Sequence, residues 1–276
     1  MTTQTIDTGT HELLCALRER VAIVTLNRPS AKNSLSSELT PALRKLIRDF
    51  ADNPQVGALI ITGTGDAFCS GGDVKGMGDN TSRRELSRDE RIADLRVKQR
   101  TLTGALMAWR KPTIAALPGV AAGAGMSLAL ACDIRIAAES ASLVTAYLKI
   151  GFSGDYGISW LLTRAVGPAR ARELLLTNKR VDARTAERIG LVNEVVPDAD
   201  LHERAFALAK SLADGPADAM RLVKDNLDEA MLVDFETSLD GEAARMIESG
   251  QSPDHKEAVR AFIEKRKPVF AAGRTS

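Results

Sequence analysis

Residues 117 to 133 read LPGVAAGAGMSLALACD, and they connect a predicted strand to a predicted helix. The strand is the apolar run from Thr113 to Leu117, and the helix begins near Ala124. Gly123 and Gly125 lack Cβ atoms, so backbone can approach closely here, and the first amides of the helix have no intrahelical acceptor. The stretch therefore suits an anion or a developing oxyanion. Tight packing of a buried helix on a sheet explains the same residues equally well.

Apolar strands alternate with amphipathic helices through the first two thirds of the chain. This alternation predicts an α/β fold with buried parallel strands. We expect strands at 21–26, 58–62, 113–117 and 133–138, and helices at 39–50, 90–109, 156–166, 169–176 and 182–189. Residues 63–73 are rich in glycine and polar, and we predict a loop there.

The pattern changes after Pro197, beyond which only amphipathic helices are predicted. These helices cover 201–212, 216–231, 235–248 and 254–267. We therefore divide the chain into a core at 1–197 and a helical C-terminal region at 198–276. The apolar faces of this region need a partner surface, which is the core, another subunit or both.

Composition excludes several classes of function. The 276 residues carry a formal net charge of +1, which gives no electrostatic basis for binding nucleic acid or a membrane surface. The three cysteines lack the spacing of a disulfide framework or a zinc site, and we expect no metal. No signal peptide or long apolar segment is visible, so we expect a cytoplasmic protein.

Two glycine-rich loops, at 69–73 and 123–125, each follow a predicted buried strand. If these strands are neighbours, amides from both loops can converge on one oxygen and form an oxyanion hole. Neither loop has the pattern of a phosphate-binding or dinucleotide-binding loop. No histidine lies near either loop, so a serine–histidine–aspartate triad would need a remote histidine.

Five segments together resemble the enoyl-CoA hydratase/isomerase (crotonase) superfamily. They are NRPSAKN at 27–33, TGTGDAFCSGGD at 62–73, PGVAAGAG at 118–125 with CD at 132–133, AERIGLVN at 186–193, and AFIEKRKP at 261–268. The resemblance spans about residues 12 to 270. It implies a spiral of ββα units, a helical region that makes homotrimers, often paired into hexamers, and coenzyme A thioesters as substrates. Coenzyme A is then part of the substrate, and no separate cofactor is expected.

The resemblance also assigns roles to individual residues. It implies that the amides of Ser70 and Ala124 bind the thioester oxygen and stabilise an enolate. Arg28 and Lys32 would lie near the nucleotide part of CoA. The alternative for each is an ordinary solvated charge on the surface. The remaining expected substrate contacts are Gly71, Gly72, Asp73, Met77, Gly123, Phe262 and Lys265.

The sequence departs from the hydratase pattern at two catalytic positions. Where hydratases of the family carry two glutamates, this chain has Ser127 and Tyr147. Neither can act as a carboxylate base, so classical hydration is in doubt. Asp155 lies where several relatives carry an aspartate that moves a double bond, isomerises a ring epoxide or displaces a halide. In an apolar pocket its pKa would be raised, which suits a proton shuttle, but a turn residue that bonds its own backbone is the alternative.

Our leading hypothesis is an acyl-CoA isomerase with Ser70 and Ala124 as oxyanion donors and Asp155 as the base. Tyr147 and Ser127 are further catalytic candidates, and structural roles are open for both. The alternatives are an enoyl-CoA hydratase with a rearranged acid/base set and, from another class, a non-catalytic acyl-CoA binding protein.

Overall fold

Two sheets form the centre of the computed structural model, which describes residues 3–73 and 86–270. The larger has seven strands in the order β1-β2-β3-β4-β6-β8-β11, and the smaller has four in the order β10-β9-β7-β5. The strands are β1 (Gln4–Ile6), β2 (Leu13–Arg18), β3 (Val21–Leu26), β4 (Ala58–Gly63), β5 (Ala67–Cys69), β6 (Thr113–Leu117), β7 (Val120–Ala122), β8 (Ile134–Ala138), β9 (Ser142–Val144), β10 (Val181–Asp182) and β11 (Glu194–Val196).

The helices follow the strands in a regular order. They are α1 (Leu39–Ala51), α3 (Arg88–Arg100), α4 (Thr103–Met107), α5 (Ala124–Leu130), α6 (Ile158–Thr177), α7 (Ala183–Arg188), α8 (Leu201–Ala213), α9 (Ala217–Ala230), α10 (Phe235–Gly250) and α11 (Pro253–Ile263), with 3-10 turns η1 (Pro29–Ala31), η3 (Tyr147–Ile150) and η4 (Asp198–Asp200). Among the described helices, none is long and apolar enough to cross a membrane.

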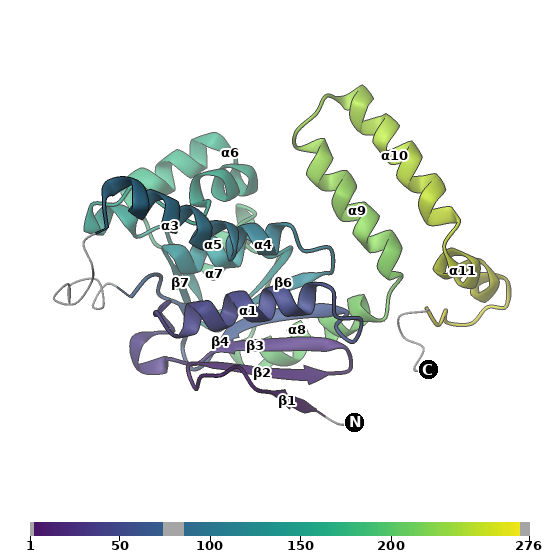
Figure 1. Ribbon diagram of the computed structural model, residues 1–276, viewed down its shortest axis with the longest axis horizontal. Coiled ribbons are helices and arrows are strands. Elements are labelled where there is room, and N and C mark those ends of the chain that lie inside the picture. Colours follow the sequence, from purple (N-terminus) through teal and green to yellow (C-terminus); the bar gives the residue numbers. More distant parts are fainter. Residues whose placement is uncertain (1–2, 74–85, 271–276) are drawn as a thin grey trace.

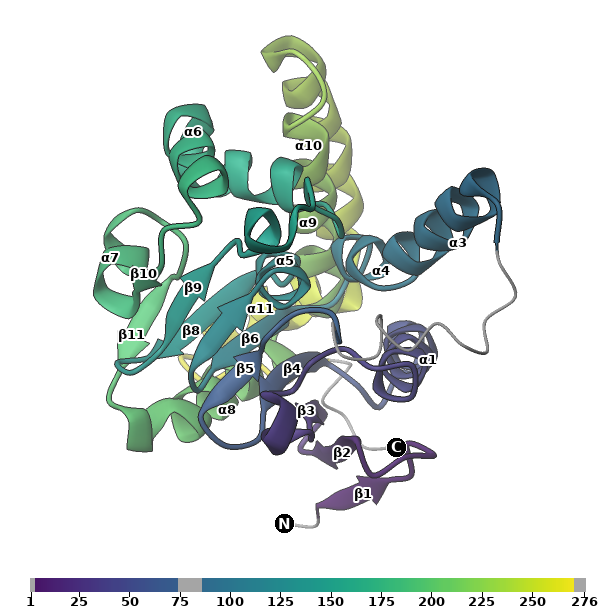
Figure 2. The same ribbon diagram turned by 90° about the vertical axis from the view of Figure 1, so that its left-hand side faces the viewer.

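A repeating ββα unit generates the two sheets. In each of the pairs β4 and β5, β6 and β7, and β8 and β9, the first strand joins the larger sheet and the second joins the smaller sheet. A helical segment then leads to the next pair (Figure 2). Strands β3, β4, β6, β8 and β11 pair in parallel, and so do β5, β7 and β9. The predicted α/β fold with a spiral of ββα units is therefore confirmed.

Two predictions about the segment before β6 were wrong in detail. The polar stretch 63–73 contains the short strand β5, in which Phe68 is fully buried. The single helix predicted at 90–109 is broken, because Leu102 has φ −114° and ψ −89° between α3 and α4. Leu102 and Leu106 are fully buried, whereas Leu95 is 38% exposed on α3.

The C-terminal helices divide into one that covers the sheet and three that extend from it. Helix α8 contacts β3, β4, β6 and β8, whereas α9, α10 and α11 form an arm beside the core (Figure 1). The four helices predicted after residue 197 are present within a few residues of the expected bounds. The division at residues 197 and 198 remains a sequence-based prediction.

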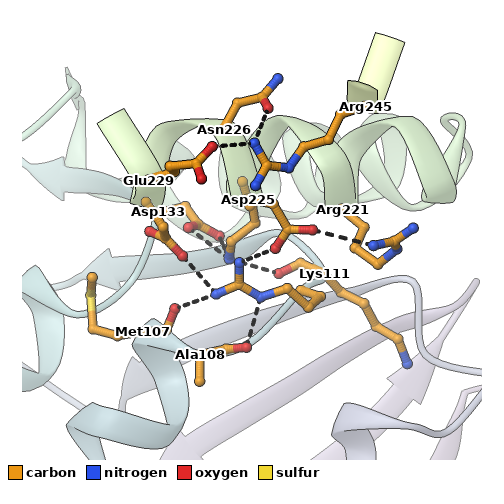
Figure 3. Close-up of polar contacts among 12 residues, drawn as sticks. Met107, Ala108, Lys111, Asp133, Arg221, Asp225, Asn226, Glu229 and Arg245 are labelled. Atoms are coloured by element: carbon orange, nitrogen blue, oxygen red, sulfur yellow. Dashed lines mark hydrogen bonds and ion pairs between the residues drawn. The ribbon is translucent and has the colours of Figure 1, made fainter. Parts of the chain in front are cut away.

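Ion pairs attach the arm to the core (Figure 3). Arg110 reaches Asp225 and Asp228 on α9, each at 2.8 Å, and Lys224 lies 2.8 Å from Asp133. Asp133 also accepts the backbone amide of Thr113 at 2.8 Å, which ties this pair to the start of β6. Partly exposed pairs of this kind contribute modest energy each, so they orient α9 more than they stabilise it.

Candidate active site

The first glycine-rich loop lies along the turn at residues 32–35. Asn33 is fully buried and holds this region together, because its side-chain amide donates to the carbonyl oxygens of Thr64 and Ala67 at 2.9 and 2.7 Å. The backbone amide of Ser70 donates to the carbonyl oxygen of Lys32 at 2.9 Å. The Ser70 amide is therefore already paired within the chain, and its predicted role as an oxyanion donor is wrong.

The backbone amide of Gly72, in the same loop, points away from the turn at residues 32–35. Leu35 and Gly72 form a parallel bridge, in which Leu35 donates to the carbonyl of Gly71 at 2.8 Å and Asp73 donates to the carbonyl of Leu35 at 3.3 Å. Such a bridge uses the peptide groups before and after its central residue, so the N–H of Gly72 faces away from Leu35. Gly72 was expected to contact the substrate, but nothing in the sequence distinguished its amide from those of its neighbours.

The second loop passes close to the first at Gly71. A Cβ atom on Gly71 would lie 3.0 Å from the carbonyl oxygen of Ala122 and 3.6 Å from the amide nitrogen of Ala124. Gly71 has φ +102°, a conformation that other residues rarely adopt. The backbone amide of Gly123 donates to the carbonyl oxygen of Val144 at 3.1 Å. This amide is therefore not available to a ligand, and Gly123 serves to position Ala124.

Ala124 is the first residue of α5, and its amide lies in the first turn, where intrahelical acceptors are absent. All seven residues of this helix are buried. Gly125 permits the packing, because a Cβ atom there would lie 2.2 Å from the carbonyl oxygen of Cys69. Within the described ranges, no hydrogen-bond acceptor is recorded for the amides of Gly72 or Ala124. Two amides from adjacent loops are thus available to a ligand.

The structure brings Ser127, Tyr147 and Asp155 together beside α5. The Tyr147 hydroxyl donates to Asp155 Oδ1 at 2.8 Å and lies 3.1 Å from Ser127 Oγ. Ser127 Oγ also contacts the Asp155 carbonyl oxygen at 3.3 Å and the Gly123 carbonyl oxygen at 3.4 Å. Ser127 lies three residues after Ala124, which is about 5 Å along the helix. The carboxylate is therefore linked to the helix turn that carries the Ala124 amide.

Burial controls the protonation of this cluster. Desolvation raises the pKa of Asp155, and the hydrogen bond from Tyr147 partly opposes that rise. Burial also raises the pKa of Tyr147, and the negative charge of Asp155 adds to this effect. Tyr147 therefore stays neutral near pH 7 and acts as a donor to Asp155. A carboxylate with a raised pKa is suited to accepting and returning a proton.

Gln99 on α3 holds the residue that follows Asp155. Its Oε1 accepts the backbone amide of Tyr156 at 2.9 Å. Tyr156 has φ +50°, which is uncommon for a residue other than glycine, so this contact helps to fix the direction of the loop. Nothing in the local sequence pattern around Gln99 indicated this contact.

Arg28 has a structural role. Its guanidinium contacts Glu12 at 2.9 Å, Asp73 at 3.0 Å and the Ser34 carbonyl oxygen at 2.9 Å. These partners bind N–H groups on all three nitrogens of the guanidinium, which a phosphate of CoA would otherwise use. The predicted contact between Arg28 and CoA is therefore not supported, and Asp73 anchors the loop through the same pair.

The other predicted contacts are spread over the chain. The side chain of Lys32 is exposed beside the first loop, and Phe262 is 85% exposed near the end of α11, with Lys265 just beyond it. Met77 lies outside the described residues. Cys69 is fully buried beneath the loop, and burial raises the pKa of its thiol to about 12, so it is not a thiolate nucleophile. No group of three or more potential metal ligands was found within residues 3–73 and 86–270.

Comparison with known proteins gives consistent matches over the whole chain. The family model for enoyl-CoA hydratase/isomerase matches residues 17–273. A protein of Mycobacterium bovis named as a "probable enoyl-CoA hydratase" is 39% identical over 95% of this chain and 98% of its own. The 1,2-epoxyphenylacetyl-CoA isomerase of Escherichia coli is 35% identical over 94% of this chain and 97% of its own. The crystal structure of an enoyl-CoA hydratase from Polaromonas superposes with a TM-score of 0.87, at 30% identity, over 94% of this chain and 99% of its own.

Replacing Tyr147 with phenylalanine tests the electrostatics of the cluster. The substitution removes the hydroxyl that stabilises the ionised carboxylate, so the pKa of Asp155 should rise further above its ordinary value. The Asp155 carboxyl carbon should then titrate at higher pH in carbon-13 NMR. Tyr156→Phe is the control, because it leaves the Tyr147 hydrogen bond in place. An unchanged or lower Asp155 pKa in Tyr147→Phe would contradict the contact.

Proposed function

Because the chain belongs to the enoyl-CoA hydratase/isomerase family, we propose that it is an acyl-CoA isomerase that stabilises a thioester enolate and shifts a proton. The family and the relatives make it a crotonase-type enzyme of the hydratase/isomerase class. The isomerisation rests on one observation above all. The Asp155 carboxylate is held by Tyr147 at 2.8 Å, within the hydroxyl cluster on the first turn of α5.

The oxyanion hole is assigned to the amides of Gly72 and Ala124. Their loops approach each other at Gly71, and neither amide has a recorded acceptor among the described residues. A thioester oxygen placed between them gains two donors, and these strengthen as negative charge develops on that oxygen in the enolate. Loss of one such donor typically reduces the rate by about 100- to 1000-fold.

Asp155 acts as the proton carrier. On a 3-enoyl thioester it removes a proton from C2, the electrons move into the thioester to give a dienolate, and the double bond shifts to C2–C3 as the same proton returns to C4. No atom is gained or lost, so one carboxyl group is sufficient. Tyr147 keeps its proton and orients the carboxylate by its hydrogen bond.

Hydration is the second candidate reaction, because several relatives are named as enoyl-CoA hydratases. It needs a group that activates water and a group that protonates carbon. Asp155 could supply one of these functions, but Ser127 and Tyr147 supply no second carboxylate. The arrangement of this cluster therefore favours isomerisation.

The CoA contacts are also part of the proposal. We assign Lys32 to the nucleotide end of CoA; its exposed side chain and the contact of its carbonyl with the first loop support this assignment. Phe262 and Lys265 lie at the end of the arm, so we assign them to CoA only in an assembled oligomer. Arg28 is not assigned to CoA, because Glu12, Asp73 and Ser34 hold its guanidinium.

Asp155→Asn tests the reaction directly. The variant keeps the size of the side chain but cannot accept the proton, so the conversion of 3-enoyl-CoA to 2-enoyl-CoA should fall by at least about 100-fold. Asp66→Asn, on an exposed turn, is the matched control and should retain full activity. Hydration of 2-enoyl-CoA without double-bond migration, unchanged in Asp155→Asn, would contradict the mechanism. CoA binding without any exchange at C2 in the unsubstituted protein would favour a non-catalytic binder.

A homotrimer or a pair of trimers is proposed as the assembly. The helices of the arm expose large apolar side chains that a monomer would leave in water. They are Val223, Leu227, Met231, Leu232, Val233, Phe235, Leu239, Met246, Ile247, Val259, Phe262 and Ile263. Sedimentation equilibrium should give three or six times the chain mass of 29.6 kDa, and a stable monomer at micromolar concentration would contradict this assignment.

A further inference from the structure

Arg44 on α1 carries an unsatisfied buried donor. Its Nε atom is shielded from solvent, and no acceptor for it is recorded in the described parts of the chain. Arg44 is flanked on the buried face of this helix by Leu43 and Ile47, which are almost fully buried. A buried donor without a partner is unfavourable, and a guanidinium carries five donors in a planar fork. A ligand with acceptor atoms would remove this cost.

The guanidinium of Arg44 lies against the phenol of Tyr156, the residue directly after Asp155. Burial raises the pKa of the Tyr156 phenol, and the charge of Arg44 opposes that rise. Tyr156 is 9% exposed, and its backbone amide is bound by Gln99 on α3. Helix α1, helix α3 and the loop that carries the proposed base therefore meet at this point.

The two carboxylates near Tyr156 are paired with other residues. Asp155 and Asp94 both act on the phenol electrostatically. The carboxylate of Asp155 accepts the Tyr147 hydroxyl, and the carboxylate of Asp94 lies 2.6 Å from Lys98 Nζ on the same helix. Arg44 therefore brings a guanidinium, hydrogen-bonded to the Tyr156 phenol, to the loop that carries Asp155.

The position of Arg44 relative to Asp155 bears on the far end of an acyl chain. With the thioester oxygen at Gly72 and Ala124, Asp155 must reach carbons close to the carbonyl group. Tyr156 directly follows Asp155 and its phenol lies against Arg44, so a chain that extends past Asp155 on that side would reach these two side chains. Most acyl chains end in a methyl group, for which a guanidinium is a poor partner.

We propose that Arg44, together with the Tyr156 phenol, binds a carboxylate at the far end of the acyl chain, so that the substrate is a dicarboxylic acid linked to CoA at one end. A carboxylate matches the guanidinium fork with two parallel hydrogen bonds and supplies the missing acceptor. This inference rests on the proposed acyl-CoA function and specifies its substrate class.

The experiment compares two 3-enoyl-CoA substrates of equal chain length, one ending in a methyl group and one in a carboxylate. The unsubstituted enzyme should prefer the carboxylate substrate in kcat/KM by about 10- to 100-fold, which is typical of a hydrogen bond to a charged group. Arg44→Met should abolish this preference, mainly through KM, and leave the methyl substrate unaffected. Arg44→Lys should retain part of the preference, because lysine keeps the positive charge but lacks the planar guanidinium.

Arg48→Met is the matched control. Arg48 lies one turn further along α1 with a side chain that is 73% exposed and paired to Asp49, so its loss should leave the preference intact. Circular dichroism and thermal unfolding report whether each variant folds. A lack of preference in the unsubstituted enzyme would overturn the inference, as would an equal loss on both substrates in folded Arg44→Met. Equal preference for a hydroxyl-ended chain would overturn the choice of a carboxylate.

Binding of saturated analogues separates this inference from the proposed chemistry. Calorimetry should show tighter binding of the carboxylate-ended acyl-CoA than of its methyl-ended counterpart, and Arg44→Met should remove the difference. This result needs no turnover, so it would stand if isomerisation failed. The methyl-ended substrate could be isomerised in an Asp155-dependent reaction while both analogues bind equally well. That outcome would support the proposed function and reject the role of Arg44.

Discussion

The close approach of two loop backbones is the constraint on which the site depends. Strands β5 and β7 are neighbours in the smaller sheet, so the loops that follow them leave the same edge. Gly71 then lies against Ala122, where a Cβ atom would be crowded and φ is +102°, and Gly125 lies against Cys69 at a separation that excludes a side chain. The requirement for glycine at these positions follows from the approach itself. Any shift between the two strands would separate the amides assigned to the oxyanion.

Burial gives the side chains around these amides their chemical character. Asp155 has a raised pKa because it is desolvated, and Tyr147 remains neutral and donates to it. Electrostatic contacts are stronger in a desolvated environment than in water. The Tyr147 hydroxyl therefore positions the Asp155 carboxylate, and Ser127 contacts both the Tyr147 hydroxyl and the Asp155 carbonyl oxygen.

Sequence patterns predicted the parts of this structure that are local. The β-branched strand at 21–26 and the amphipathic helix at Leu39–Ala51 form close to the expected bounds. Strand β5 was not predicted, because it has only three residues in a glycine-rich stretch. Its pairing partner β7 is distant in the sequence, so no local pattern marks it as a strand. Ser70 was chosen over Gly72 because a sequence does not show which amide of a loop is taken by Lys32. The partners of Arg28 and the contact of Gln99 with Tyr156 are likewise long-range and left no local pattern.

The most direct test of the central claim is a crystal structure with a non-reactive acyl-CoA thioester bound. The thioester oxygen should lie about 3 Å from the amide nitrogens of both Gly72 and Ala124, the distance expected for oxyanion donors. The hydrogen bond between Ser70 and Lys32 should persist in that complex. A thioester oxygen that binds the Ser70 amide instead, or that lies away from both loops, would contradict the account.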